Sequence, residues 1–344
     1  MTHSYPEDSR PEADEAADPG EGVEYRALTL PSQANGQRLD KVLAELLPEF
    51  SRSYLQQLIE QGLVRKKNVK PGDAVAAPAK ASLKTKAGEE WVVELRPTPQ
   101  SQAFKPEPMA LDIVHRDEHL LIVNKPVGLV VHPAPGNWSG TLLNGLLAAD
   151  AQAAQLPRAG IVHRLDKDTS GLMVVARTRA AMDALVALIA RRDVSRQYLA
   201  LAHRPWRGGE RREVNAPIGR DPANRLRMAV VDLALSPGKT ASTTIEPLVS
   251  RDAWCWVRCT LGTGRTHQIR VHMASLGHPL VGDALYGGAP AGGLHRQALH
   301  AWRLAFVHPM TGEPLCFYAD LPQDMAEAGR LLGLSYNESH PASP

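Results

Sequence analysis

The stretch GIVHRLDKDTSGLMVV, residues 160–175, places a dense run of charged and hydroxyl side chains between two apolar segments. A solvated turn needs only a glycine and one or two polar residues. Asp166 lies at the centre of the run, with Arg164 and Lys167 close to it in sequence. Cationic neighbours favour the ionised form of a carboxyl group, and an ionised aspartate is suited to act as a nucleophile or a base. A surface loop of ion pairs is the alternative.

The segments that flank this loop predict the elements that hold it. Residues 161–162 read as the end of one strand and residues 172–176 as the next strand. Further strand and helix periods follow in LDIVHRDEHLLIVNKP (111–126, two strands), TRAAMDALVALIA (178–190, a helix capped by Thr178), QYLALA (197–202) and CWVRCTL (255–261). Because strands and helices do not alternate regularly, we predict a mixed α/β domain around a mainly antiparallel sheet.

A smaller module precedes this domain. RLDKVLAELLPEF (38–50) and SRSYLQQLIEQG (51–62) each place leucines on one helical face, the second with Ser51 or Ser53 as its N-cap. Residues 62–86 then carry seven basic residues and one acid, and a short strand closes the segment. Two helices and a basic β-hairpin gather arginine and lysine where they can meet phosphates. A solvated charged face is the alternative.

Charge is distributed unevenly along the 344 residues. Residues 1–24 contain eight acids and one arginine, so this tail has a net charge of −7 and the remaining 320 residues carry +9. A basic body favours an anionic partner such as nucleic acid. The acidic tail has too few large apolar residues to fold, so we predict that it is disordered.

The cysteine content and the absence of long apolar runs bear on the compartment. Cys255, Cys259 and Cys316 are too few for a disulfide framework and suit a reducing environment. No run approaches the ~20 apolar residues that cross a bilayer, and the N-terminus lacks the pattern of a secretory signal. We therefore expect a cytoplasmic protein without membrane contact. Cys255 and Cys259 would lie about 13 Å apart on one face of a strand, which predicts core positions and excludes a shared zinc.

The N-terminal module resembles the S4 RNA-binding domain. The resemblance rests on RLDKVL (38–43), SRS (51–53) and LIEQGLV (58–64). The chain departs from that family at the hairpin turn, where Asn68 and Val69 stand in place of the usual Asn-Gly pair. The resemblance implies RNA binding, and the basic side chains assigned to it are Arg52, Arg65, Lys66 and Lys67.

The larger domain resembles the pseudouridine synthases of the A/C/D branch, which modify ribosomal RNA, and is most similar to the D type. The motifs that carry this resemblance are NKPVGLVVHP (124–133), HRLDKDTSGLMVVA (163–176), QYLALAHRPW (197–206) and TGRTHQIRVHMASLGHPLVGDALYGG (263–288). Such enzymes cleave the bond from uridine N1 to C1′, turn the base and rejoin it through C5. Because the reaction is an isomerisation, the resemblance implies no metal, oxidant or nucleotide cofactor.

The resemblance also implies roles for five residues of the larger domain. Asp166 matches the catalytic carboxylate, and Tyr198 matches an active-site tyrosine whose ring can stack on the flipped uracil. Arg270 matches an arginine that pairs with the catalytic aspartate. Arg164 would fill the place of the extruded nucleotide, with a phosphate contact as its alternative. Arg265 would contact the RNA backbone.

The segment around Arg270 predicts a helix. Thr266 is a candidate N-cap for a helix over HQIRVHMASL (267–276). His267 and His272 would point about 140° apart on that helix, which makes them a poor pair of metal ligands. We therefore expect no metal site here.

The resemblance implies an isomerase that converts uridines of 23S ribosomal RNA to pseudouridine, with the helix 69 stem-loop as the target expected for the D type. We expect a monomer that acts on free RNA or on the assembling large subunit. A non-catalytic RNA-binding or ribosome-assembly factor on the same fold is one alternative. A carbohydrate or nucleoside hydrolase is another, with Asp166 and Asp168 as its carboxylate pair. These two lie in one loop, however, so we expect Asp168 to position the loop through backbone amides.

The predicted order of segments follows from these motifs. It comprises an acidic tail (1–24), the S4 domain (25–95), a proline-rich linker (96–108), the catalytic domain (109–325) and a C-terminal tail (326–344).

Overall fold

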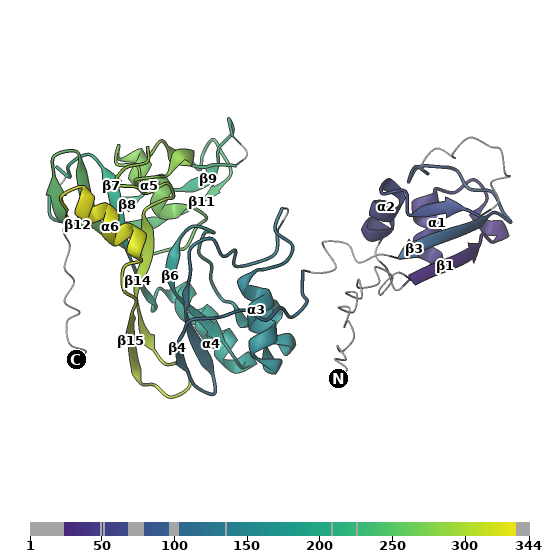
Figure 1. The fold of residues 1–344 in the computed structure, drawn as a ribbon, viewed down its shortest axis with the longest axis horizontal. Helices are drawn as coiled ribbons and strands as arrows, with labels where there is room; N and C mark the ends of the chain where they lie inside the picture. Colours follow the sequence, from purple (N-terminus) through teal and green to yellow (C-terminus); the bar gives the residue numbers. More distant parts are fainter. Residues whose placement is uncertain are drawn as a thin grey trace, which may run out of the picture. The chain divides into compact units, whose positions relative to one another are not determined.

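The computed structural model describes residues 24–48, 50, 52–67, 79–95, 103–134, 136–207, 209–224 and 226–334. The chain forms two compact units, Met1–Gln102 and Ala103–Pro344, which Figure 1 draws in purple to blue and in blue to yellow. In the described part of the chain, no helix is long and apolar enough to span a membrane. The predicted acidic tail and the hairpin turn at Asn68 lie outside the described residues, apart from Glu24.

The N-terminal unit packs two helices against a small antiparallel sheet. Its elements are β1 (Glu24–Thr29), the 3₁₀ helix η1 (Ser32–Ala34), α1 (Leu39–Leu46), α2 (Arg52–Glu60), β2 (Val64–Lys66) and β3 (Glu90–Leu95). The strand order is β1-β3-β2. Leu39, Leu43, Leu55 and Leu58 are fully buried between the helices and the sheet, so the predicted helical faces are confirmed. The strand β1 was not predicted.

The larger unit is built on a nine-stranded mixed sheet with the order β4-β5-β6-β14-β7-β13-β12-β8, with β15 paired to β14. The strands are β4 (Ile113–Arg116), β5 (Leu120–Lys125), β6 (Ser170–Ala176), β7 (Ser195–His203), β8 (Arg212–Asn215), β12 (Ser242–Arg251), β13 (Trp254–Leu261), β14 (Leu299–Val307) and β15 (Pro314–Tyr318). β6 and β14 are parallel, and the other neighbours are antiparallel. The predicted mixed, mainly antiparallel fold is therefore confirmed.

Helices and a second small sheet complete this unit (Figure 1). The helices are α3 (Leu142–Ala149), η3 (Ala151–Gln155), η4 (Pro157–Gly160), α4 (Arg179–Arg191), α5 (Gln268–Ser275), η5 (Ala284–Tyr286) and α6 (Gln323–Leu331). The small sheet has the order β10-β9-β11, from β9 (Ile218–Arg220), β10 (Met228–Val230) and β11 (Gly238–Lys239). The Thr178 hydroxyl accepts the Ala181 N–H, so the predicted cap of α4 is confirmed.

The strand β7 shows how the sheet carries a core on each face. Successive side chains of a strand point to opposite faces. Tyr198 and Ala200 accordingly pack with residues of α5 in one cluster, whereas Leu199 and Leu201 pack with residues of α6 in another. Burial on both faces explains why QYLALA reads as a nearly continuous apolar run.

The entry and exit of the central strand β6 differ from each other. Residues 161–162 do not form the predicted strand, because η4 ends at Gly160 and Ile161 makes only an isolated bridge to Val175. At the exit of the charged loop, Gly171 lies in the left-handed region with φ +109°. A Cβ there would meet the Ala301 carbonyl oxygen of β14 at 2.2 Å. Only glycine permits this close parallel pairing.

Two predicted segment boundaries need correction. In the predicted linker, Ala103 is buried, and the Asn144 side-chain amide donates to the Ala103 and Lys105 carbonyls. Residues from 103 onward therefore pack on the larger unit. In the predicted C-terminal tail, Ala328 and Leu334 are buried in the core beneath α6. The apolar spacing of α6 thus anchors the chain as far as residue 334.

Candidate active site

A pocket of about 350 Å³ lies in the larger unit and brings five predicted residues together. The residues of this set that line it are Arg164, Asp166, Tyr198, Arg265 and Arg270. They come from the charged loop before β6, from β7, from the segment that leads into α5, and from α5 itself. The convergence of side chains 104 residues apart identifies this pocket as the candidate active site.

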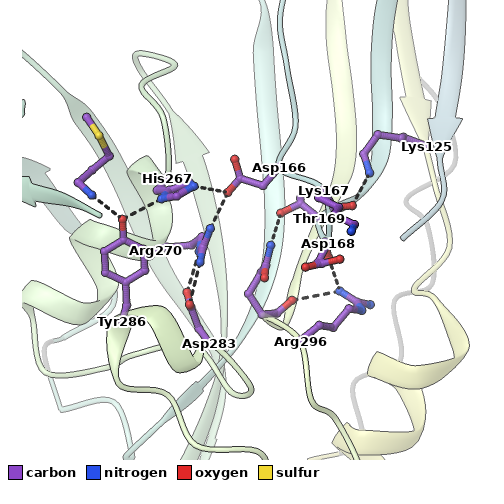
Figure 2. A network of polar contacts seen from close by, with 12 residues as sticks. Lys125, Asp166, Lys167, Asp168, Thr169, His267, Arg270, Asp283, Tyr286 and Arg296 are labelled. Atoms are coloured by element: carbon purple, nitrogen blue, oxygen red, sulfur yellow. Dashed lines mark hydrogen bonds and ion pairs between the residues drawn. The ribbon is translucent and has the colours of Figure 1, made fainter. Parts of the chain in front are cut away.

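The charged loop is held by its own carbonyl groups (Figure 2). The Thr169 N–H donates to the Asp166 carbonyl at 3.1 Å. The Lys167 carbonyl accepts from the Lys125 ammonium at 3.0 Å, and the Asp168 carbonyl accepts from Arg296 at 3.0 Å. In the described part of the chain, no backbone amide donates to the Asp168 carboxylate, so the predicted contact of that side chain is wrong. Asp168 positions the loop through its carbonyl instead.

Lys125 is a buried support of the loop that sequence reasoning missed. Its ammonium has no exposed surface and donates to the carbonyls of Pro126, Leu129 and Lys167. Burial lowers the pKa of Lys125 to about 8, against the attraction of Asp168 and Asp166. This one side chain thereby ties residues 126–129 to the charged loop. Lys125 lies within the motif NKPVGLVVHP (124–133), which was the only sign in the sequence that it could matter.

Arg270 connects the Asp166 carboxylate to a second, buried carboxylate. Its Nη1 donates to Asp166 Oδ2 at 3.0 Å, while Nε and Nη2 donate to the two oxygens of Asp283 at 2.8 and 2.9 Å. Burial disfavours the charged guanidinium, but the hydrogen bonds and charges of Asp283 and Asp166 prevail and raise the pKa of Arg270. The bidentate pair fixes the plane of the guanidinium, so its remaining nitrogen holds Asp166 in one orientation.

His267 faces the same oxygen of Asp166 as Arg270 does and was missed as a site residue (Figure 2). Its Nε2 lies 3.9 Å from Asp166 Oδ2, and its Nδ1 lies 2.8 Å from the Tyr286 hydroxyl. That hydroxyl accepts the Met228 N–H and can donate its own proton to Nδ1, which leaves the Nε2 proton facing Asp166. Burial lowers the pKa of His267, although Asp166 opposes the shift.

The start of α5 differs from the prediction. His267, and not Thr266, is the N-cap residue, and it adopts the left-handed conformation with φ 55°. Its side chain does not cap the helix, because its ring is directed to Tyr286 and Asp166. His272 lies inside the helix and contacts Thr243 and Ala216. The two histidines thus have separate surroundings.

Tyr198 is buried in the pocket wall, with 5% of its surface exposed. Burial raises the pKa of Tyr198 to about 12, with a further contribution from the charge of Asp166 and an opposing one from Arg196. The phenol therefore stays protonated at neutral pH. Tyr198 offers a ring face and a hydroxyl proton rather than a base.

The two remaining arginines of the predicted set differ in their freedom. Arg164 is exposed and lines both the active-site pocket and a neighbouring cavity. Arg265 is half-buried, and its Nε donates to the Thr240 carbonyl at 3.0 Å. The Arg164 side chain is therefore exposed at the mouth of two hollows, whereas Arg265 is held beside the pocket.

The basic residues predicted in the N-terminal unit all lie next to acids. Arg52 donates to the buried Asp40 at 2.9 Å, and Arg38 and Gln56 bind the same carboxylate. The hydrogen bond from Arg38 is the main cause that lowers the pKa of Asp40. Ion pairs also join Arg65 to Glu94 (3.8 Å), Lys66 to Glu89 (2.9 Å) and Lys67 to Glu90 (3.2 Å). The contact of Arg52 with Asp40 stabilises the fold of this unit, and all four basic side chains remain about half exposed or more.

Comparison with known proteins places both units. The RNA pseudouridylate synthase family model matches residues 119–275, and the S4 domain model matches residues 37–65. Ribosomal large subunit pseudouridine synthase D of Neisseria meningitidis serogroup A is 49% identical over 313 residues, covering 87% of this chain and 79% of that protein. Its namesake in Nitrosomonas europaea is 47% identical over 308 residues, covering 87% and 85%.

A solved structure supports the fold of the larger unit. Human RNA Pseudouridylate Synthase Domain Containing 4 matches with a TM-score of 0.52 and 24% identity, over 66% of this chain and 94% of that chain. The matched family region contains Asp166, Tyr198 and Arg270, which the pocket brings together. The chain therefore belongs to the RNA pseudouridylate synthase family, and it is an RNA pseudouridine synthase with an N-terminal S4 domain.

Proposed function

We propose that this enzyme converts uridines of large-subunit ribosomal RNA to pseudouridine in the helix 69 stem-loop. The observation that carries the proposal is the Asp166 carboxylate, held by Arg270 at 3.0 Å in a pocket beside Tyr198. The names of the relatives support ribosomal RNA as the substrate. A stem-loop suits an enzyme that must extrude its base, because unpaired uridines cost least to flip.

Asp166 acts on the sugar of the flipped uridine. Arg270 holds the carboxylate in one orientation, so that it attacks C1′ or removes the C2′ proton. The bond from N1 to C1′ then breaks and the base turns within the pocket. C5 bonds to C1′ as the bond from Asp166 to C1′ breaks or, in the other route, as the C2′ proton returns. The C5 proton leaves and N1 gains one, so the overall reaction is an isomerisation that needs neither an oxidant nor a nucleotide.

The other predicted residues handle the RNA. Tyr198 stacks on the extruded uracil, and its hydroxyl is a proton donor at neutral pH because burial raises the pKa of Tyr198 to about 12. Arg164 occupies the place that the base leaves, and Arg265 contacts the backbone. Arg65, Lys66 and Lys67 of the S4 unit add phosphate contacts that raise the effective concentration of the loop.

The setting of the reaction follows from its substrate. We place the enzyme in the cytoplasm, where it acts as a monomer on free 23S RNA or on the assembling large subunit. We further propose that residues 25–95 bind RNA and that residues 109–325 carry out catalysis. Residues 103–108 and 326–334 pack on the catalytic domain and extend it at both ends.

Tritium release from ribosomal RNA labelled at uridine C5 tests the proposal, because bonding at C5 expels that hydrogen. We expect release by the wild type and none by Asp166→Asn, which keeps the shape of the side chain and removes its charge. Release by both proteins would overturn the role of Asp166. No release from naked RNA or immature subunits would favour a non-catalytic binding factor. Mapping the modified positions then decides whether helix 69 is the target.

A further inference from the structure

Arg196 is a buried cation in the wall of the active-site pocket, and the proposed steps leave it without a role. It lies in β7, has 5% of its surface exposed, and lines the pocket. Within the described residues, no carboxylate lies within ion-pair distance of its guanidinium, and its Nε lacks any hydrogen-bond partner. An uncompensated buried charge is costly, so such a group calls for an acceptor that arrives with the ligand.

A second polar atom of the same pocket lacks a partner. The Val174 N–H donates to Nε2 of His163 at 3.0 Å, which places the imidazole proton on Nδ1. That nitrogen is buried and unpartnered in the described part of the chain. Burial, with Arg196 adding to it, lowers the pKa of His163 to about 3, so this side chain is neutral. Two residues that line the pocket therefore each carry a buried donor without an acceptor in the described part of the chain.

The strand geometry places Arg196 at the edge of the proposed base site. Residues two apart on a strand point to the same face about 6.6 Å apart, so Arg196 lies beside Tyr198. A uracil that stacks on the Tyr198 ring would direct an edge, with its O2 or O4 oxygen, toward the guanidinium. The apolar side chains of Val162, Ile189 and Leu299 line the same pocket, which suits a flat base better than a hydrated phosphate.

We propose that Arg196 binds a carbonyl oxygen of the extruded uracil and stabilises the negative charge of the detached base. This inference rests on the proposed role of Asp166. When the N1–C1′ bond breaks, its electron pair leaves with the uracil and spreads over N1, O2 and O4. When C5 bonds to C1′, the base returns a pair to the sugar and its charge is lost. The negative charge of the detached uracil exists only between these two steps. A hydrogen-bond donor such as Arg196 in a water-poor site lowers the barrier most when it stabilises such a transient charge.

The lack of a side chain at Gly264 leaves room for the guanidinium of Arg196. A Cβ at residue 264 would meet Nη1 of Arg196 at 2.9 Å. The variant Gly264→Ala would therefore displace the guanidinium without removing its charge. It provides a second probe, independent of any folding defect caused by substitution of Arg196 itself.

Single-turnover tritium release with excess enzyme tests the proposal on Arg196→Gln, Gly264→Ala and the exposed control Arg191→Gln. We expect Arg196→Gln to slow tritium release from bound RNA by about 10²- to 10³-fold. Gly264→Ala should slow it by about tenfold or more. Arg191→Gln, which removes a charge paired with Asp193 at the surface, should keep the wild-type rate. The melting temperature of Arg196→Gln should stay equal or rise, because an unpaired buried charge is removed.

Three results would overturn the proposal. The first is a rate for Arg196→Gln close to that of the wild type. The second is a lower melting temperature with a parallel loss of RNA affinity, which indicates a structural role. The third is an RNA affinity of Arg196→Gln whose salt dependence is weaker than that of the wild type by about one phosphate contact. That result would indicate that Arg196 binds the RNA backbone. Activity in Asp166→Asn would instead overturn the role of Asp166, and no release by the wild type would overturn the proposed function, so these failures are distinguishable from that of Arg196.

Discussion

Arg270 holds the Asp166 carboxylate through a single nitrogen at 3.0 Å, because its other two donor positions are committed to Asp283. The guanidinium is thus anchored before any substrate arrives. Its plane passes over the Tyr286 ring, with 5.0 Å between the Arg270 Cζ and the ring centroid. This arrangement presents the carboxylate in one orientation at the pocket and makes Asp283 a positioning residue.

The variant Asp283→Asn should lower activity through Arg270, because residue 283 is expected to make no contact with the substrate. It leaves Arg270 with only one of its two carboxylate partners, so we expect a loss of about 3 kcal/mol in the free energy of unfolding and about 10²-fold in kcat, with KM for RNA little changed. Denaturant unfolding and steady-state tritium release measure these quantities. Glu327→Gln, at an exposed pair with Arg330, is the control. An equal rise in KM would argue against a role in orientation.

Replacing Arg164 by alanine should distinguish a wedge from a phosphate contact. If Arg164 fills the place of the base, its loss should slow turnover about 10²-fold on a folded stem-loop, because unstacking costs a few kcal/mol. The effect should shrink on an unstructured oligonucleotide that contains the same uridine. Lys167→Ala removes a neighbouring exposed charge and should affect both substrates alike. Equal losses on both substrates for Arg164→Ala would indicate a phosphate contact.

The S4 unit should contribute affinity more than chemistry. Deletion of residues 1–95 should weaken binding to ribosomal RNA in a filter assay, with little change in turnover at saturating RNA. The milder triple change of Arg65, Lys66 and Lys67 to glutamine should lower the salt dependence of binding by up to about three phosphate contacts. Unchanged affinity in either protein would show that this unit does not tether the substrate.

His300 should make the fold acid-sensitive. Its Nδ1 accepts from the Ser170 hydroxyl at 2.9 Å and its Nε2 donates to the Ala319 carbonyl, while burial lowers the pKa of His300 to about 4 from the ordinary 6.5. Between those pH values the unfolded chain binds a proton that the folded chain does not. Stability should therefore fall as pH drops from 6.5 to 4, by about 3 kcal/mol for this one group.

Urea unfolding at a series of pH values checks this slope. The variant His300→Gln should have a shallower dependence on pH over the same window, by up to about one proton. His295→Gln, at an exposed position, should leave the dependence of the wild type unchanged. Parallel curves for His300→Gln and the wild type would contradict the assignment.

Local patterns predicted the elements well where one residue type dominates a face. The helices α1, α2 and α4 and the buried cysteines Cys255 and Cys259 follow directly from apolar periodicity. The strand β1 was missed because EYRALT alternates weakly, and it is completed only by pairing with β3. The left-handed start of α5 was missed because its cause is the contact of a ring with distant side chains.

The site was predictable to the extent that its residues belong to recognisable motifs. Asp166, Tyr198 and Arg270 meet in the pocket as expected. Asp283 and Lys125 could not be assigned, because their value lies in partners that the fold brings together from other segments. No spacing in the chain reports that a lysine will face three carbonyls.

The parallel pairing of β6 and β14 has a consequence for the order of assembly. Ser170 and Gly171 come immediately after the charged loop, and they pair with His300 and Ala301 of β14. The paired residues are 130 positions apart along the chain. Contacts of such long range close late in folding. During translation, β6 leaves the ribosome well before β14, so a nascent chain that lacks β14 has no partner strand for the exit of the loop. We therefore expect the enzyme to become active only after β14 has been synthesised.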